Sequence, residues 1–182
     1  MTDAQALPAL TAHYRAMRSL VSGTDVWVAL HIGAEQTVVA VGREADPATL
    51  LTLAIGADLT ARHHFHHTPP SPLELENAIV TVEDEVTRAR AAIPAGARLG
   101  STDTALREIA RLSGIHPADR MCLPLESLER TFERLAQVSL GRPVLSGGLP
   151  ASQHFAATLL ILREFMHHLQ FAEITLLEPL PV

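Results

Sequence analysis

Four histidines surround Phe65 and form the most evident metal-binding candidate in the sequence: His63, His64, His66 and His67. On a helix, His63 and His67 would share one face at a spacing of four residues, which suits zinc or nickel. The segment lacks the acidic third ligand and the general base of an H-E-x-x-H site. The dipole also favours imidazolium at the carboxyl end of a helix, so an ordinary helix terminus is the alternative interpretation.

A second candidate segment, residues 31–38, follows an apolar run and contains His31, Gly33, Glu35 and Thr37. A phosphate loop needs consecutive glycines, because their backbone N–H groups can then point together at one anion. Here only one glycine is present, and Glu35 is expected to place a carboxylate near the pocket, where it would repel a phosphate. His31 is a poor ligand for the hard cation Mg²⁺.

Other reactive side chains lack the partners that catalysis would require. Cys122 is the only cysteine, which excludes an intrachain disulfide, and without a clear base it is expected to lie in the core. Glu83, Asp84 and Glu85 are adjacent on an expected helix and so point to different faces, which argues against a shared acid–base role. The sequence contains no nucleophile elbow, Walker loop or dinucleotide fingerprint.

The composition is that of one ordered globular domain. The chain has 182 residues, of which 47% are hydrophobic and 19% charged. A net charge of −6, with every basic residue an arginine, argues against nucleic acid as a partner. Since the start lacks a signal-like pattern and no apolar run approaches about 18 residues, we expect a cytoplasmic protein without a membrane partner.

Hydrophobic periodicity divides the chain into alternating classes of element. Strands are expected at 26–32, 36–41, 49–55, 97–99 and 172–177. Helices are expected at 7–20, 57–67, 72–93, 104–113, 125–138 and 151–169, with a flexible break at 146–150. The helix from 72 has the strongest start signal, because Ser71 can cap it and Pro72 occupies its first turn.

This order predicts an α/β, ribonuclease H-like fold with a mixed five-stranded sheet and helices packed on its faces. We expect a single domain over residues 1–182. Residues 1–22 would form a lead-in helix, and residues 25–178 would form the ribonuclease H-like core.

The order of motifs also resembles the second half of the Ppx/GppA family, the exopolyphosphatases and guanosine pentaphosphate phosphohydrolases of the actin and Hsp70 superfamily. The family's phosphate loop, D-I-G-G-G-S-T-E, corresponds to residues 31–38, which keep Ile32, Gly33 and Thr37. Residues 51–62 are similar to its "slplGavrlterf" segment, and residues 100–106 to its G-G-T-x-T-x-L turn. Further similarities follow in the family's order at residues 125–135, 147–150, 156–162 and 173–176.

The resemblance implies one lobe of the actin-like ATPase fold. In the family, hydrolysis takes place in a cleft between two lobes, and the other lobe supplies a second phosphate loop and the catalytic base. We expect that this chain has no room for that lobe. No catalytic residue is therefore assigned, and Mg²⁺ is implied only if the protein is active. The candidate phosphate or nucleotide contacts are His31, Gly33, Glu35, Thr37, Gly100, Ser101 and Thr102.

Two functions remain open from the sequence. One is a degenerate, non-catalytic exopolyphosphatase-like domain that binds phosphate or a nucleotide, or acts as a homodimeric assembly module. The other is a reduced phosphohydrolase that acts on polyphosphate or guanosine pentaphosphate with a second lobe from a partner or a second copy. A homodimer is expected because a lobe that faces a neighbour retains an apolar wall that is unfavourable in water.

Overall fold

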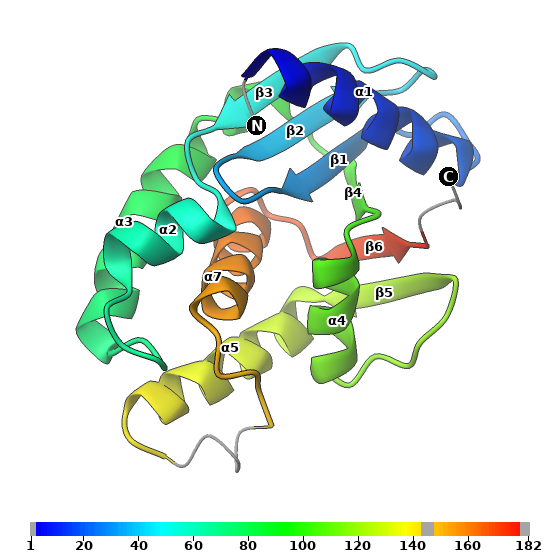
Figure 1. The fold of residues 1–182 in the computed structure, drawn as a ribbon. Coiled ribbons are helices and arrows are strands. Elements are labelled where there is room, and N and C mark those ends of the chain that lie inside the picture. Colours follow the sequence, from blue (N-terminus) through cyan, green and yellow to red (C-terminus); the bar gives the residue numbers. More distant parts are fainter. Residues whose placement is uncertain (1–2, 143–147, 179–182) are drawn as a thin grey trace.

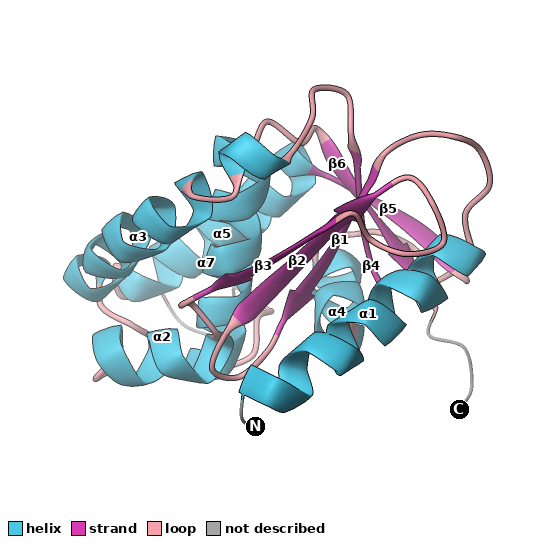
Figure 2. Cartoon of the chain, turned by 90° about the horizontal axis from the view of Figure 1, so that it is seen from above, coloured by secondary structure: helices cyan, strands magenta, loops and turns pink. Residues whose placement is uncertain are grey.

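A mixed six-stranded sheet separates two unequal layers of helices (Figures 1 and 2). The computed structural model describes residues 3–142 and 148–178. Of the break expected at 146–150, residues 148–150 are described, and residues 146 and 147 lie outside the described residues.

All six strands lie in one sheet, in which neighbouring strands pair in both directions. β1 (Trp27–Ile32), β2 (Thr37–Gly42) and β3 (Thr49–Leu53) form an antiparallel meander. β4 (Arg98–Ser101) runs parallel to β1, and β6 (Glu173–Leu177) runs parallel to β4. The order across the sheet is β3-β2-β1-β4-β6-β5, which places the carboxyl ends of β1, β4 and β6 at the same edge.

The sheet has one strand more than the five expected. β5 (Arg120–Pro124) pairs antiparallel with β6 at the edge of the sheet. Only Met121 and Leu123 are buried in this strand, so its alternating pattern is too short to distinguish it from a loop. Its pairing depends on β6, which lies about 50 residues further along the chain.

The helices are shorter than expected at two of their carboxyl ends. Their bounds are α1 Asp3–Ser19, α2 Ala57–His64, α3 Pro72–Thr87, α4 Thr104–Leu112, α5 Leu125–Ser139 and α7 Gln153–His168, with a 3₁₀ turn at Arg90–Ala92. α2 was expected to reach residue 67 and α3 residue 93. α3 begins at the Ser71 cap that the sequence indicates, and Glu74 completes a capping box in which the two side chains each accept the other's backbone N–H. No helix in the described ranges is long and apolar enough to cross a bilayer.

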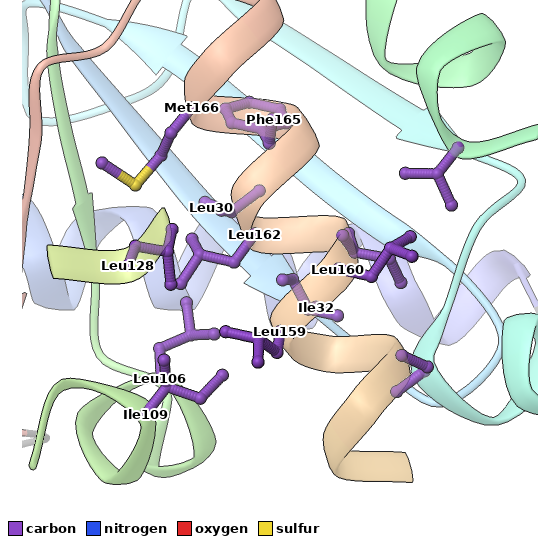
Figure 3. Close-up of a cluster of buried hydrophobic side chains, with 14 of the residues drawn as sticks. Leu30, Ile32, Leu106, Ile109, Leu128, Leu159, Leu160, Leu162, Phe165 and Met166 are labelled. Carbon is purple, nitrogen blue, oxygen red and sulfur yellow. The ribbon is translucent and has the colours of Figure 1, made fainter. Parts of the chain in front are cut away.

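α7 is the centre of the larger core. It is buried on nearly every side, as expected for a helix that is apolar around most of its circumference. Figure 3 shows Leu159, Leu160 and Leu162 of α7 among side chains from β1, α4 and α5. This packing fixes the side of the sheet that carries α2, α3, α4 and α5.

The other face of the sheet is covered by α1 (Figure 2). Tyr14 and Met17 of α1 are completely buried against Trp27 and Ala29 of β1. Gly100 in β4 permits this approach, because a Cβ at that position would lie 2.8 Å from the Met17 Sδ atom. The helix is thereby held beside the carboxyl ends of β1 and β4.

Candidate functional site

The site is built at the carboxyl end of β1, where His31 faces α1. Alternation along the strand directs Val28, Leu30 and Ile32 into the larger core. His31 therefore lies on the opposite side, with Trp27 and Ala29. It is the polar residue of that side of β1, and its side chain is 37% exposed.

Asp103 reaches the same point from the neighbouring strand. It follows β4 and stands at the N-cap position of α4, but its side chain makes no capping hydrogen bond. Its Oδ1 atom instead lies 2.7 Å from Nδ1 of His31, and its Oδ2 atom accepts the Ile32 N–H at 3.0 Å. An aspartate at an N-cap normally serves its own helix, so this carboxylate is diverted to β1.

The third member of the cluster, His13, comes from α1. It stands one turn before Met17, which anchors the helix on the sheet. Its Nε2 atom lies 3.8 Å from Asp103 Oδ1, and its ring centroid lies 5.3 Å from that of His31. The Thr102 Oγ1 atom lies 3.0 Å from His13 Nδ1 and 3.2 Å from Nε2, which fixes the position of the ring.

The two histidines have opposite pKa shifts. The hydrogen bond to Asp103 raises the pKa of His31 and outweighs the opposing effect of burial. Burial lowers the pKa of His13, although Asp103 partly counteracts it. The pKa of His13 is therefore lower than that of His31, so His13 is the imidazole that more readily offers a lone pair.

The turn at residues 33–36, within the segment that corresponds to the family's phosphate loop, is hydrogen-bonded to its own chain. The Gly33 N–H donates to the Gln36 carbonyl, and the carbonyls of Gly33 and Ala34 accept from the first N–H groups of α2. Gly56, just before α2, packs directly on this turn, because a Cβ there would lie 2.4 Å from the Gln36 nitrogen. The carbonyl groups of the turn thus satisfy the hydrogen-bonding capacity of the first N–H groups of α2.

Glu35 pairs with an arginine that the sequence analysis did not anticipate. Its two carboxylate oxygens accept hydrogen bonds from Arg62 of α2, at 2.9 and 2.7 Å. Both side chains are exposed, and the bond to Arg62 lowers the pKa of Glu35. We expected the Glu35 carboxylate to repel a phosphate. This expectation changes, because Arg62 neutralises the Glu35 charge.

Thr37 and the β4 residues are more buried than a ligand contact requires. Thr37 lies on the side of β2 that carries Val39 and Val41, and its hydroxyl is completely buried without a hydrogen-bond partner. Gly100 lies beneath α1, and the buried Ser101 accepts the Asp103 N–H. Of the predicted contacts, His31 and Thr102 are the two that the fold brings into the cluster.

His63 and His67 do not have the helical relation that their spacing suggested. α2 ends at His64, because Phe65 turns extended and is buried in the larger core. His67 instead places Nδ1 2.9 Å from Glu74 Oε1. The metal site proposed for this pair therefore loses its geometric basis.

Cys122 is exposed rather than buried, because it occupies the outward position of an edge strand. Partial desolvation, together with the hydrogen bond and the charge of Glu173, raises the pKa of its thiol to about 11. A thiol with this pKa is largely protonated at neutral pH, and the thiolate is the nucleophilic form. A cavity of about 450 Å³ lies nearby, at the amino ends of β4 and β6, and so is separate from the cluster at their carboxyl ends.

The sequence indicated His31 and Thr102, but it did not indicate His13 or Asp103 as site residues. Asp103 could have been found, because the carboxyl ends of parallel β1 and β4 meet at one edge of the sheet. His13 carries no such signal, since its position depends on how α1 packs across the sheet.

Comparison with known proteins identifies the fold. No protein-family profile and no curated protein sequence matches the chain. A solved structure of the Ppx/GppA enzyme of Aquifex aeolicus aligns with a TM-score of 0.76 and 14% identity, over 92% of this chain and 58% of that chain. An exopolyphosphatase from Cytophaga hutchinsonii aligns with a TM-score of 0.71 and 13% identity, again over 92% and 58%.

A protein described as exopolyphosphatase-like gives a TM-score of 0.72 at 12% identity, over 94% of this chain and 61% of that chain. The predicted α/β fold and its resemblance to one Ppx/GppA lobe are confirmed. The chain spans about three fifths of the length of these solved chains.

Proposed function

We propose that this chain is an exopolyphosphatase-like lobe that binds a phosphate-bearing ligand or nucleotide and does not hydrolyse polyphosphate or guanosine pentaphosphate by itself. The fold likeness supplies the expectation of a phosphate ligand. The absence of hydrolysis is argued from the residues at the carboxyl ends of β1 and β4.

The observation that carries this proposal is the packing of the 33–36 turn on the start of α2. Phosphate capture by main chain requires several free N–H groups that converge on one anion. Here the Gly33 N–H is bonded within the turn, and Gly56 covers the Gln36 nitrogen. This arrangement supports a ligand contact through side chains, and His31, whose side chain is 37% exposed, is the predicted contact in the cluster that a ligand can reach.

The donor set at the end of β1 also does not fit the Mg²⁺ that the fold likeness suggests. Mg²⁺ prefers an octahedral set of oxygen ligands, and two of the three groups here are imidazoles. A hydrolytic mechanism that depends on Mg²⁺ therefore has no support from this cluster.

The test combines an activity assay with a binding assay. Purified protein with Mg²⁺ should release no phosphate from polyphosphate or guanosine pentaphosphate above the background of a His31→Ala variant. Polyphosphate or a guanine nucleotide should raise the melting temperature, because a ligand that binds the native state stabilises it. Hydrolysis that the variant abolishes, or no thermal response to any phosphate ligand, would contradict the proposal.

The alternative is a reduced phosphohydrolase that a second lobe completes. It is favoured because the alignment covers 92% of this chain but 58% of each solved chain. The described surface gives a homodimer little support. Its exposed large hydrophobic side chains are Leu73 and Val80 on α3, with Leu140 just after α5. Sedimentation velocity discriminates between these functions, because a monomer without phosphate release at every concentration excludes an enzyme assembled from two copies.

A further inference from the structure

We infer that His13, His31 and Asp103 form a binding site for a first-row transition metal ion such as Zn²⁺. In the part of the chain that the structure describes, these residues are the one group of three potential ligands whose donor atoms lie close together. The inference shares His31 with the proposed phosphate contact, but it requires neither phosphate binding nor hydrolysis.

The distances between the donor atoms are close to those of a tetrahedral ion. Zinc–donor bonds of about 2.0–2.1 Å place neighbouring donors about 3.3 Å apart. The Asp103 Oδ1 atom lies 2.7 Å from His31 Nδ1 and 3.8 Å from His13 Nε2, and all three donors lie within 4.8 Å of one another. Shifts of the donor atoms by about an ångström or less, through side-chain rotation, would therefore admit an ion between the three donors.

The surrounding groups hold the ligands as the outer shell of a metal site does. The Ile32 N–H binds Asp103 Oδ2 and leaves Oδ1 directed at the histidines. Thr102 Oγ1 lies 3.0 Å from His13 Nδ1 and 3.2 Å from Nε2, so its hydroxyl can bond Nδ1 when a metal ion takes Nε2. Such partners orient ligands and select the histidine tautomer. A tetrahedral ion held by these three protein ligands has a fourth coordination position. Because the His31 side chain is 37% exposed, water or an anion can reach that position.

The chemistry of the donors selects the class of metal. Two imidazoles and one carboxylate suit zinc, cobalt, nickel or iron, whereas Mg²⁺ and Ca²⁺ prefer oxygen donors. The three residues come from α1, from the end of β1 and from the start of α4. An ion would therefore bridge the lead-in helix and the sheet.

The experiment is a calorimetric titration of tag-free, chelator-treated protein with Zn²⁺. We expect one ion per chain, no competition from Mg²⁺, and at least about a tenfold loss of affinity in His13→Gln and in Asp103→Asn. Substitution by Co²⁺ should give the visible absorption of a low-coordinate nitrogen and oxygen site. Both variants are first melted without metal, so that only variants that unfold cooperatively are compared.

The control is the double variant His63→Gln and His67→Gln, which removes two histidines from another surface. It should bind Zn²⁺ as the parent does. The inference is overturned if the parent binds no stoichiometric ion, if the His13 and Asp103 variants retain full affinity, or if only the control variant loses it.

Discussion

Asp103 Oδ1 lies 2.7 Å from His31 Nδ1, although 72 positions separate the two residues in the chain. The contact joins the ends of two neighbouring parallel strands. Since Asp103 also accepts the Ile32 N–H, one carboxylate satisfies both a side chain and the main chain of β1. This pairing gives the first prediction.

Asp103→Ala should destabilise the fold by about 1–3 kcal/mol, because it leaves the partly buried Ile32 N–H and His31 without their acceptor. Asp103→Asn keeps an oxygen for Ile32 and should cost less. Both substitutions should lower the pKa of His31, since the bond to Asp103 raises it. Urea unfolding and NMR titration of the His31 ring measure the two effects.

The same pair predicts the sign of a pH effect. A raised folded-state pKa of His31 contributes stability that is complete below its ordinary value of 6.5 and is lost as the pH rises through the raised value. The stability difference between the parent and Asp103→Asn should therefore be larger at about pH 5.5 than at about pH 8.5. A difference that grows with pH instead would contradict the assigned pairing.

Gly56→Ala should destabilise the protein by about 1–3 kcal/mol, because the new Cβ would meet the backbone of the 33–36 turn. The three nearest atoms, from Ala34, Glu35 and Gln36, are all main chain, so they cannot rotate away as a flexible side chain would. Thermal melting measures the loss. An unchanged melting temperature would show that the turn is not packed on the start of α2.

Leu160→Ala should cost about 2–5 kcal/mol, because it opens a cavity in the fully buried centre of α7. Leu73→Ala is the matched control, since that leucine is 65% exposed and its truncation should stay within about 0.5 kcal/mol. Urea unfolding of both variants gives the comparison. Equal losses at the two positions would contradict the central place of α7 in the core.

Cys122 should react slowly with iodoacetamide at pH 8, since desolvation and Glu173 raise the pKa of the thiol to about 11. Glu173→Gln removes the negative charge, so it should lower the pKa of the thiol and speed alkylation at that pH. The pH dependence of the alkylation rate measures the shift. A parent thiol that titrates near pH 8 would exclude the hydrogen bond to Glu173.

Local patterns predicted the parts of the fold that local physics determines. Alternating side chains gave β1–β3, and Ser71 marked the start of α3. β5 was missed because Met121 and Leu123 form too short a pattern without the neighbouring β6. The end of α2 was placed too late, because burial of Phe65, a tertiary effect, ends the helix before any proline does.

The same division holds for the site. His31 was identified because it opens the segment that resembles the family's phosphate loop, whereas its partner Asp103 had the ordinary features of a helix cap. His13 stands in a helix whose contacts depend on Gly100 and Trp27, residues distant in the sequence. A cluster assembled from three separate elements is therefore visible only after folding.

The packing of Met17 over Gly100 has a consequence for how this lobe can be trimmed or rearranged. α1 both shields one side of the sheet and carries His13. A shortened chain that starts at residue 23 would therefore expose Trp27 to water and also lose the His13 donor. Detachment of α1 from the sheet would have the same two effects: solvent would reach the apolar side chains of the strands, and His13 would separate from His31 and Asp103.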